Sequence, residues 1–305
     1  MRLIESIKKK LRKKRESEKN IRDINEIIQY HVRKLTMDRM ALSSDKPLVT
    51  QERQHSSPIV VSLTTYSVRI HSVHLVIESI AQQTIKPNKI VLWLDKNEFS
   101  IDTIPLILKK QMERGLEVKF CPNYKSYKKI YPTIKEYPDH DIITLDDDLI
   151  YPHDTIEQLV STSRKNPYSI IGHRAHSIII ENRKFKPYKI WPKEINNNSE
   201  PYFNFITTGG GTLFPYVIAK IIFEDQELFT SICPTADDVW INLKSMQHNI
   251  NRIKVNDPRD FKRRFIHIPD ELGIGLNHYN VNNYCGNDIQ INAVVTFLSD
   301  KINLG

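Results

Sequence analysis

Four short apolar runs, separated by segments of helical spacing, constrain the fold of this chain more than any other feature. Runs and segments alternate along the first half of the sequence: 59–63, 73–83, 90–94, 104–114, 116–120, 127–136 and 142–145. Strands that alternate with helices predict βαβ units and a parallel sheet covered by helices on both faces. We therefore expect an α/β fold with a doubly wound, mostly parallel sheet, in which ligands bind beyond the carboxyl ends of the strands.

Composition divides the 305 residues into three regions. We expect residues 1–46 to form a basic helical extension, 47–58 a linker rich in Ser, Pro and Gln, and 59–305 a compact domain large enough to be catalytic. No run approaches the ~20 apolar residues that a membrane-spanning helix needs, and the basic N-terminus lacks the apolar stretch of a secretory signal. The three cysteines lie far apart, without a Cys-x-x-Cys pair. We expect a cytoplasmic protein without a disulfide scaffold.

Most of the net charge lies at the N-terminus. Residues 1–20 hold nine Lys or Arg against three Glu, which is +6 of the chain's +8 and leaves the remainder almost neutral. A nucleic-acid-binding domain normally spreads its positive charge over a folded face, so no nucleic-acid partner is expected. With an apolar stripe of Leu3, Ile4, Ile7 and Leu11, this segment fits a peripheral anchor on the anionic inner face of a membrane and a solvated arm equally well. Apolar residues continue at a spacing of three and four up to Leu35. A third alternative is therefore that this helix pairs two subunits into a homodimer.

The fourth apolar run ends directly in three carboxylates, Asp146, Asp147 and Asp148. Acidic residues are depleted in strands, and like charges this close repel one another. A divalent cation would neutralise them, and carboxylate oxygens suit hard cations such as Mg²⁺ or Mn²⁺. Alternate residues of an extended chain point the same way, so we expect Asp146 and Asp148 to share one face. The alternative is a solvated acidic turn in which one Asp caps the next helix.

A second acidic pair, Asp237 and Asp238, stands before a helical segment. One carboxylate of the pair can cap that helix. The other can act as a general base if a cleft tunes its pKa. Helix capping is the simpler explanation of the pair taken alone, so the catalytic interpretation depends on the first acidic cluster lying nearby.

Other candidate contacts follow from the rule that ligands bind beyond the strand ends. The residues that follow the first two strands are Thr64, Tyr66, Arg69 and Asp95. Lys125 and Lys129 place positive charge beyond the third strand, where a phosphate can bind; a solvated helix face is the alternative.

Two later features are weaker. The triplet Gly209, Gly210 and Gly211 permits the close backbone approach of loops that cradle ligands, and a flexible hinge is the alternative. The triplet belongs to neither a P-loop nor a Gly-x-Gly-x-x-Gly motif. His267 and His278 are candidate contacts for a metal or a phosphate, although a single His is more often a packed or surface residue.

From residue 59 to about residue 290 the sequence resembles bacterial glycosyltransferases of the GT-A fold, similar to the family 2-like enzymes of surface-polysaccharide synthesis. The matching segments are 61–66 with Arg69, 79–84 with 86–87, 90–94, 146–148, 209–211 and 236–240. The Asp-x-Asp motif is short and common by chance. Its position after a fourth strand, with the glycine triplet and the second acidic pair downstream, makes the resemblance more specific.

The resemblance implies that the chain transfers a sugar from a nucleotide-sugar donor, expected to be UDP-linked, to a glycan or lipid-linked acceptor, with inversion favoured. It implies that Asp146 lies near the donor sugar or ribose and that Asp148 binds the metal and diphosphate, with Mn²⁺ or Mg²⁺ as cofactor. Many relatives have Glu-Asp at the second pair, so either Asp can be the base. We favour Asp238, which is closer to Trp240, a surface on which an acceptor sugar can stack.

The expected site residues can then be grouped by role. The base candidates are Asp238 and Asp237; the metal ligands are Asp148, Asp146 and His278; the acceptor contact is Trp240; the donor contacts are Thr64, Tyr66, Arg69, Asp95, Lys125, Lys129, Asp146, Asp147, Gly210 and Gly211.

Three alternatives are weighed against this interpretation. A nucleotidyltransferase of sugar phosphates also uses a doubly wound sheet, carboxylates and Mg²⁺, but normally carries a Gly-rich basic signature after the first strand, and residues 63–69 contain no Gly. A phosphatase with an aspartyl nucleophile would carry its Asp-x-Asp motif after the first strand. A non-catalytic glycan-binding protein with a transferase-like fold would not need both acidic groups.

Overall fold

The computed structural model describes residues 2–196, 198–269, 286–298 and 302. A seven-stranded sheet lies at its centre in the order β12-β6-β11-β4-β1-β2-β3. Its strands are β1 (Ile59–Thr64), β2 (Lys89–Asp95), β3 (Leu116–Cys121), β4 (Asp141–Thr144), β6 (Ile170–Gly172), β11 (Thr212–Phe214) and β12 (Arg252–Lys254). β11 runs antiparallel to both of its neighbours, and all other pairs in the sheet are parallel.

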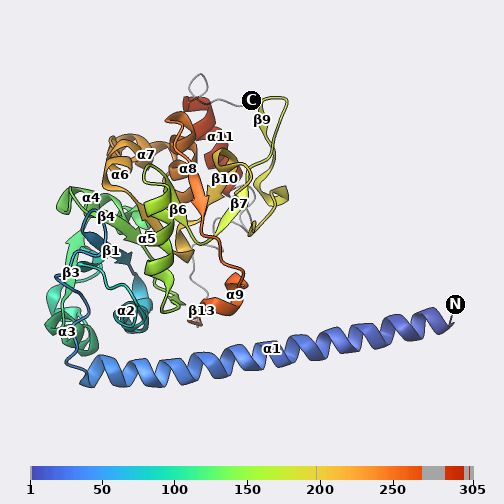
Figure 1. Cartoon of the computed structure of the whole chain (residues 1–305), viewed down its shortest axis with the longest axis horizontal. Coiled ribbons are helices and arrows are strands. Elements are labelled where there is room, and N and C mark those ends of the chain that lie inside the picture. Colours follow the sequence, from blue (N-terminus) through green and yellow to red (C-terminus); the bar gives the residue numbers. More distant parts are fainter. Residues whose placement is uncertain (1, 197, 270–285, 299–301, 303–305) are drawn as a thin grey trace.

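Helices cover both faces of this sheet (Figure 1). The described helices are α1 (Arg2–Ser43), α2 (Val73–Ala81), α3 (Leu106–Glu113), α4 (Tyr131–Glu136), α5 (Thr155–Lys165), α6 (Tyr216–Ile222), α7 (Gln226–Ile232), α8 (Asp237–Gln247), α9 (Phe261–Arg264) and α11 (Gly286–Leu298), and most of α1 extends beyond the sheet. Short 3₁₀ turns connect several elements: η1 (Ser67–His71), η2 (Ile101–Thr103), η3 (Lys125–Lys129), η4 (Tyr188–Ile190), η5 (Pro201–Phe203) and η6 (Thr208–Gly210).

Three two-stranded ladders lie outside the central sheet. β5 (Leu149–Ile150) pairs with β13 (Ile266–His267), β7 (Ala175–Ser177) with β10 (Asn204–Ile206), and β8 (Ile180–Glu181) with β9 (Lys184–Phe185).

The side-chain alternation of the strands creates two hydrophobic cores. Val60 and Val91 face one core, together with apolar residues of α4, α6, α7, α8 and α11. Val61 and Leu92 face the other core, with α2, α3, α5 and the end of α1. A strand buried on both faces needs apolar residues at successive positions, which is why the runs in the sequence are continuous rather than alternating. The expected α/β fold, with a doubly covered, mostly parallel sheet and an N-terminal helical extension, is confirmed.

Two of the expected helices start later than predicted, next to a proline. In the segment 104–114, α3 begins after Pro105 at its N-cap, and 127–136 becomes the end of η3 followed by α4, with Pro132 in the first turn. Proline has no backbone N–H and is tolerated in the first turn of a helix, so each helix begins within one residue of its proline. Gly115 has φ +110° after α3, in the left-handed region expected for a residue that ends a helix.

Helix α1 runs past the folded body and ends beneath it (Figure 1). Its last turns are anchored: Met37 and Ala41 are buried, and Arg114 donates to the carbonyl of Met40. Within the described residues, no helix combines the length and the apolar character needed to span a bilayer.

Candidate active site

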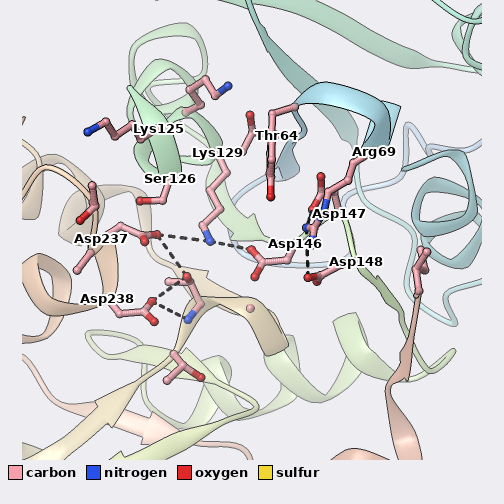
Figure 2. Close-up of a pocket in the computed structure, with 18 of the residues that line it drawn as sticks. Thr64, Arg69, Lys125, Ser126, Lys129, Asp146, Asp147, Asp148, Asp237 and Asp238 are labelled. Carbon is pink, nitrogen blue, oxygen red and sulfur yellow. Dashed lines mark hydrogen bonds and ion pairs between the residues drawn. The ribbon is translucent and has the colours of Figure 1, made fainter. Parts of the chain in front are cut away.

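A cavity of about 720 Å³ opens at the carboxyl ends of β1 and β4, where the parallel-sheet rule places ligands. Its walls come from segments that are far apart in the sequence: the ends of β1 and β4, η1, η3, η6 and the start of α8 (Figure 2). The predicted residues that line it are Thr64, Tyr66, Arg69, Lys125, Lys129, Asp146, Asp147, Asp148, Gly209, Asp237, Asp238 and His267. The fold therefore brings the two acidic groups of the sequence into one cavity.

In the triplet, the middle carboxylate differs from its neighbours. The Asp147 side chain is buried, accepting hydrogen bonds from Thr65 Oγ1 at 2.6 Å and from an Arg69 guanidinium nitrogen at 2.8 Å. The side chains of Asp146 and Asp148 are each about one-third exposed, at 34% and 35%. Two carboxylates thus face the cavity, while the third fixes the turn that carries them.

Cationic groups balance the triplet. Arg69 also lies 3.3 Å from an Asp148 oxygen, and Lys129 Nζ donates to Asp146 Oδ1 at 2.7 Å. Burial and the charge of Asp148 raise the pKa of Asp147 to about 6, even though Arg69 opposes the shift. Burial and the charge of Asp146 likewise raise the pKa of Asp148. Burial is the main cause of both shifts, repulsion between the carboxylates adds to it, and Arg69 offsets only part of the rise in pKa.

Gly209 explains part of the glycine triplet. A Cβ atom on Gly209 would lie 2.6 Å from Asp146 Oδ2, so any larger residue would collide with the carboxylate. The hydroxyl of Tyr151 joins the two segments: it donates to the Gly209 carbonyl at 2.8 Å and accepts the Asp146 backbone N–H at 2.9 Å. The glycine loop thus holds Asp146 in place.

Lys129 connects the two acidic groups (Figure 2). Its buried ammonium lies 2.7 Å from Asp146 and 3.4 Å from Asp237. Burial lowers the pKa of Lys129, but the surrounding carboxylates outweigh it and raise the pKa above the usual value, so the side chain stays charged.

Asp238 has a different environment from Asp237. Its Oδ1 accepts the backbone N–H of Thr208 at 2.9 Å and the Thr208 hydroxyl at 2.8 Å, and within the described part of the chain it forms no ion pair. Burial and the charge of Asp237 raise the pKa of Asp238 to about 7, against the opposing effect of Lys129. A carboxylate with a pKa near neutrality, facing a cavity, is suited to accept a proton from a bound hydroxyl.

The residues present suit a hard divalent cation that arrives with a diphosphate. The described residues contain no group of three or more His, Cys, Asp or Glu arranged to hold a metal by themselves. Mg²⁺ is commonly held by one or two carboxylates plus substrate phosphates, and Asp146 and Asp148 offer two partly exposed carboxylates. The third expected ligand, His278, lies outside the described residues.

Four predicted contacts do not line the cavity: Asp95, Gly210, Gly211 and Trp240. Trp240 corrects the stacking hypothesis, because its side chain is 1% exposed and its indole N–H donates to the Ile222 carbonyl inside the core. Asp95 is buried and accepts the Asn97 N–H in the turn after β2. Gly210 packs against Phe261, and Gly211 has φ +97°, so both shape the loop rather than the cavity wall.

Sequence reasoning missed Thr208, Arg174 and Tyr188, which also line the cavity. Arg174 follows β6, a three-residue strand that was not predicted. Had residues 170–172 been recognised as a strand, the carboxyl-end rule would have pointed to Arg174. Thr208 stands beside the glycine triplet, which was the signal available for it.

Comparisons with known proteins give weak structural likenesses. No protein-family model matches the sequence, and no curated protein matches it significantly. Similar solved structures include a mannosyltransferase from Pyrobaculum calidifontis in complex with GDP-Man and Mn²⁺, at 13% identity and a TM-score of 0.46, covering 82% of this chain and 68% of that one. TarS of S. aureus in complex with UDP has 14% identity and a TM-score of 0.42, covering 65% and 58%. A CMP:2-keto-3-deoxy-manno-octonic acid synthetase with CTP has 11% identity and a TM-score of 0.40, covering 65% and 89%. With every TM-score below 0.5, these likenesses decide nothing about chemistry, which has to be inferred from the cavity itself.

Proposed function

We propose that the protein is a metal-dependent glycosyltransferase. It moves a sugar from a nucleotide-sugar donor, for which a UDP-sugar is the first candidate, to a hydroxyl of a glycan or lipid-linked acceptor. One observation carries the proposal: a single cavity holds a carboxylate cluster paired with Arg69 and Lys129 and, across Lys129, a second pair whose Asp238 has a pKa near 7. A transferase needs both parts, one to bind the diphosphate of the donor and one to take the proton of the acceptor.

On the donor side, Asp146 and Asp148 are the residues that would hold Mn²⁺ or Mg²⁺. The cation, when bound, would stabilise the negative charge that develops on the departing nucleoside diphosphate. Lys125, at the wall of the same cavity, adds a positive charge for the phosphates. Arg69 keeps the turn of the triplet in position through its bonds to Asp147 and Asp148.

On the acceptor side, Asp238 is the proposed general base. Its carboxylate would take the hydroxyl proton while the hydroxyl oxygen attacks the anomeric carbon on the face opposite the leaving group, which inverts the configuration. Thr208 orients the carboxylate through two hydrogen bonds. Asp237 is the weaker candidate for the base, because Lys129 already neutralises it.

A panel of nucleotide sugars, incubated with the full chain with and without Mn²⁺, tests the proposal through the phosphate product. A transferase releases a nucleoside diphosphate and adds a hexose mass to an acceptor. A nucleotidyltransferase, given nucleoside triphosphates and sugar phosphates, releases pyrophosphate instead. Binding of donors without either product would identify a non-catalytic glycan-binding protein and refute the proposed activity.

A further inference from the structure

Helix α1 carries an apolar stripe that the folded body does not cover. The stripe consists of Ile21, Ile24, Ile28, Val32, Leu35 and Leu42, and each of these side chains is more than half exposed. At 3.6 residues per turn, the six positions fall within an arc of about 80°. Exposed apolar residues scattered singly are ordinary, but six on one face of one helix form a continuous surface.

The stripe lies on the side of the helix that faces away from the body. Met37 and Ala41 are buried, and Tyr30 packs against the same core. These three residues lie roughly 150° around the helix from the centre of the stripe. A hydrogen bond of 2.7 Å between Asp38 and His74 of α2 also fixes this orientation. The stripe is therefore neither part of the core nor free to turn toward it.

Toward the N-terminus of α1, the face that carries the stripe becomes positively charged. Lys10, Lys13 and Lys14 are exposed, and by helical spacing they follow the stripe along one side of α1. Lys14 approaches Glu18 at 3.9 Å, an exposed pair that contributes little. Helix α1 as a whole has 13 Lys or Arg and 6 Asp or Glu, so its net charge of +7 accounts for nearly all of the +8 of the chain.

We infer that α1 is a lipid-surface helix, which lies in the plane of an anionic membrane with this stripe in the headgroup region and the lysines on lipid phosphates. Helices of this kind combine an apolar stripe with basic residues and bind through buried apolar area plus attraction to anionic lipid. Charge favours lipid over a second copy of the chain, because in a parallel helix pair along this face Lys10 and Lys14 would meet the lysines of the partner. The inference does not depend on the proposed transferase activity.

The inferred orientation also positions the cavity. α1 lies beside β13, and His267 of β13 lines the cavity wall. The cavity edge formed by β13 is therefore on the side of the body that is nearest the membrane.

Vesicle binding by the full-length protein tests the inference, with phosphatidylcholine vesicles and vesicles that also contain phosphatidylglycerol. We expect binding to the anionic vesicles only, weakened by high salt. Ile24→Ala/Ile28→Ala should weaken it at least about tenfold, and Gln29→Ala/Thr36→Ala, on another exposed face of α1, should leave it within about twofold. Equal binding by wild type and the Ile24→Ala/Ile28→Ala variant, or equal binding to neutral vesicles, overturns the inference.

Two further measurements test the depth of the stripe in the lipid and the competing assignment to a dimer. A tryptophan reports insertion directly, because the native Trp93, Trp191 and Trp240 are buried: brominated lipid should quench Ile28→Trp and not Gln29→Trp. Equal quenching in both variants contradicts the orientation.

Sedimentation equilibrium without lipid should show a monomer, and a dimer that the Ile24→Ala/Ile28→Ala substitutions dissociate would assign the stripe to a second copy instead.

Discussion

Arg69 and Lys129 supply a cationic partner to every carboxylate of the triplet 146–148, whereas in the second pair Asp237 contacts Lys129 and Asp238 forms no ion pair with a described cation. Both groups contain adjacent aspartates, and the sequence does not distinguish them. The difference in their cations separates carboxylates suited to hold a charged ligand from one, Asp238, that titrates near neutral pH. The different environments of the two acidic groups therefore follow from the positions of two basic side chains, Arg69 and Lys129.

The largest expected effect concerns the base. Asp238→Asn should lower kcat by ~10²–10⁴-fold, the usual contribution of a general base, while donor affinity changes little because the base acts on the acceptor. Asp237→Asn should cost less, since that carboxylate is already paired with Lys129. Steady-state kinetics at saturating donor measure both. Near wild-type turnover in both variants would make the pair structural.

Removing Lys129 tests the link between the two groups. Lys129→Met leaves Asp146 and Asp237 without their buried partner, and breaking a buried ion pair in this way costs about 3–5 kcal/mol of unfolding free energy. Urea unfolding at pH 8 measures the loss, and adding Asp146→Asn should restore part of it. Lys128→Met is the matched control, because Lys128 is buried in the same turn and forms no ion pair with a described carboxylate. Equal destabilisation by the two lysine variants would contradict the bridging role.

Asp148 tests the binding role of the triplet. We expect Mn²⁺ to tighten binding of a UDP-sugar by about tenfold or more in the wild type, since one or two carboxylates and the phosphates would share the cation. Asp148→Ala should remove that dependence, and Asp139→Ala, an exposed aspartate outside the cavity, should retain it. Calorimetric titration with and without Mn²⁺ measures the change. An unchanged Mn²⁺ effect in folded Asp148→Ala would show that Asp148 is not a ligand.

The smallest expected effect is on the pH dependence of the free energy of unfolding. Folding raises the pKa of Asp238 to about 7. The folded protein therefore keeps a proton on this carboxyl that the unfolded chain releases near pH 4. The stability contributed by this group falls as pH rises from about 4 to 7. Asp238→Asn should therefore be more stable than wild type at pH 8, by a few kcal/mol at most, with the difference vanishing near pH 4. Thermal unfolding across this range checks the sign, and a variant less stable than wild type at pH 8 would contradict it.

The fold was more predictable than the site. The runs at 59–63, 90–94, 116–120 and 142–145 became β1 to β4, because strands buried on both faces require continuous apolar sequence. β6, β11 and β12 have three residues each, too few to show a period, and β11 is antiparallel.

Within the site, sequence position located the carboxylates but not their partners. Asp146 follows a recognisable strand and Asp238 lies at the start of a recognisable helix. The contacts of Lys129 with both groups join residues 17 and 108 positions apart and depend on tertiary packing. Trp240 was misinterpreted because an aromatic two residues from a polar site can turn toward the cavity or toward the core, and on α8 it turns toward the core.

The central claim is that Asp238, in the second acidic pair of the cavity, changes its protonation near neutral pH. A ¹³C NMR titration of aspartate-labelled protein tests it without any knowledge of the substrate, and the signal of Asp238 is assigned by its absence in Asp238→Asn. We predict that this signal titrates with a midpoint near pH 7, and that Lys129→Met moves the midpoint upward by removing an opposing charge. A midpoint below pH 5 for this signal would contradict the account.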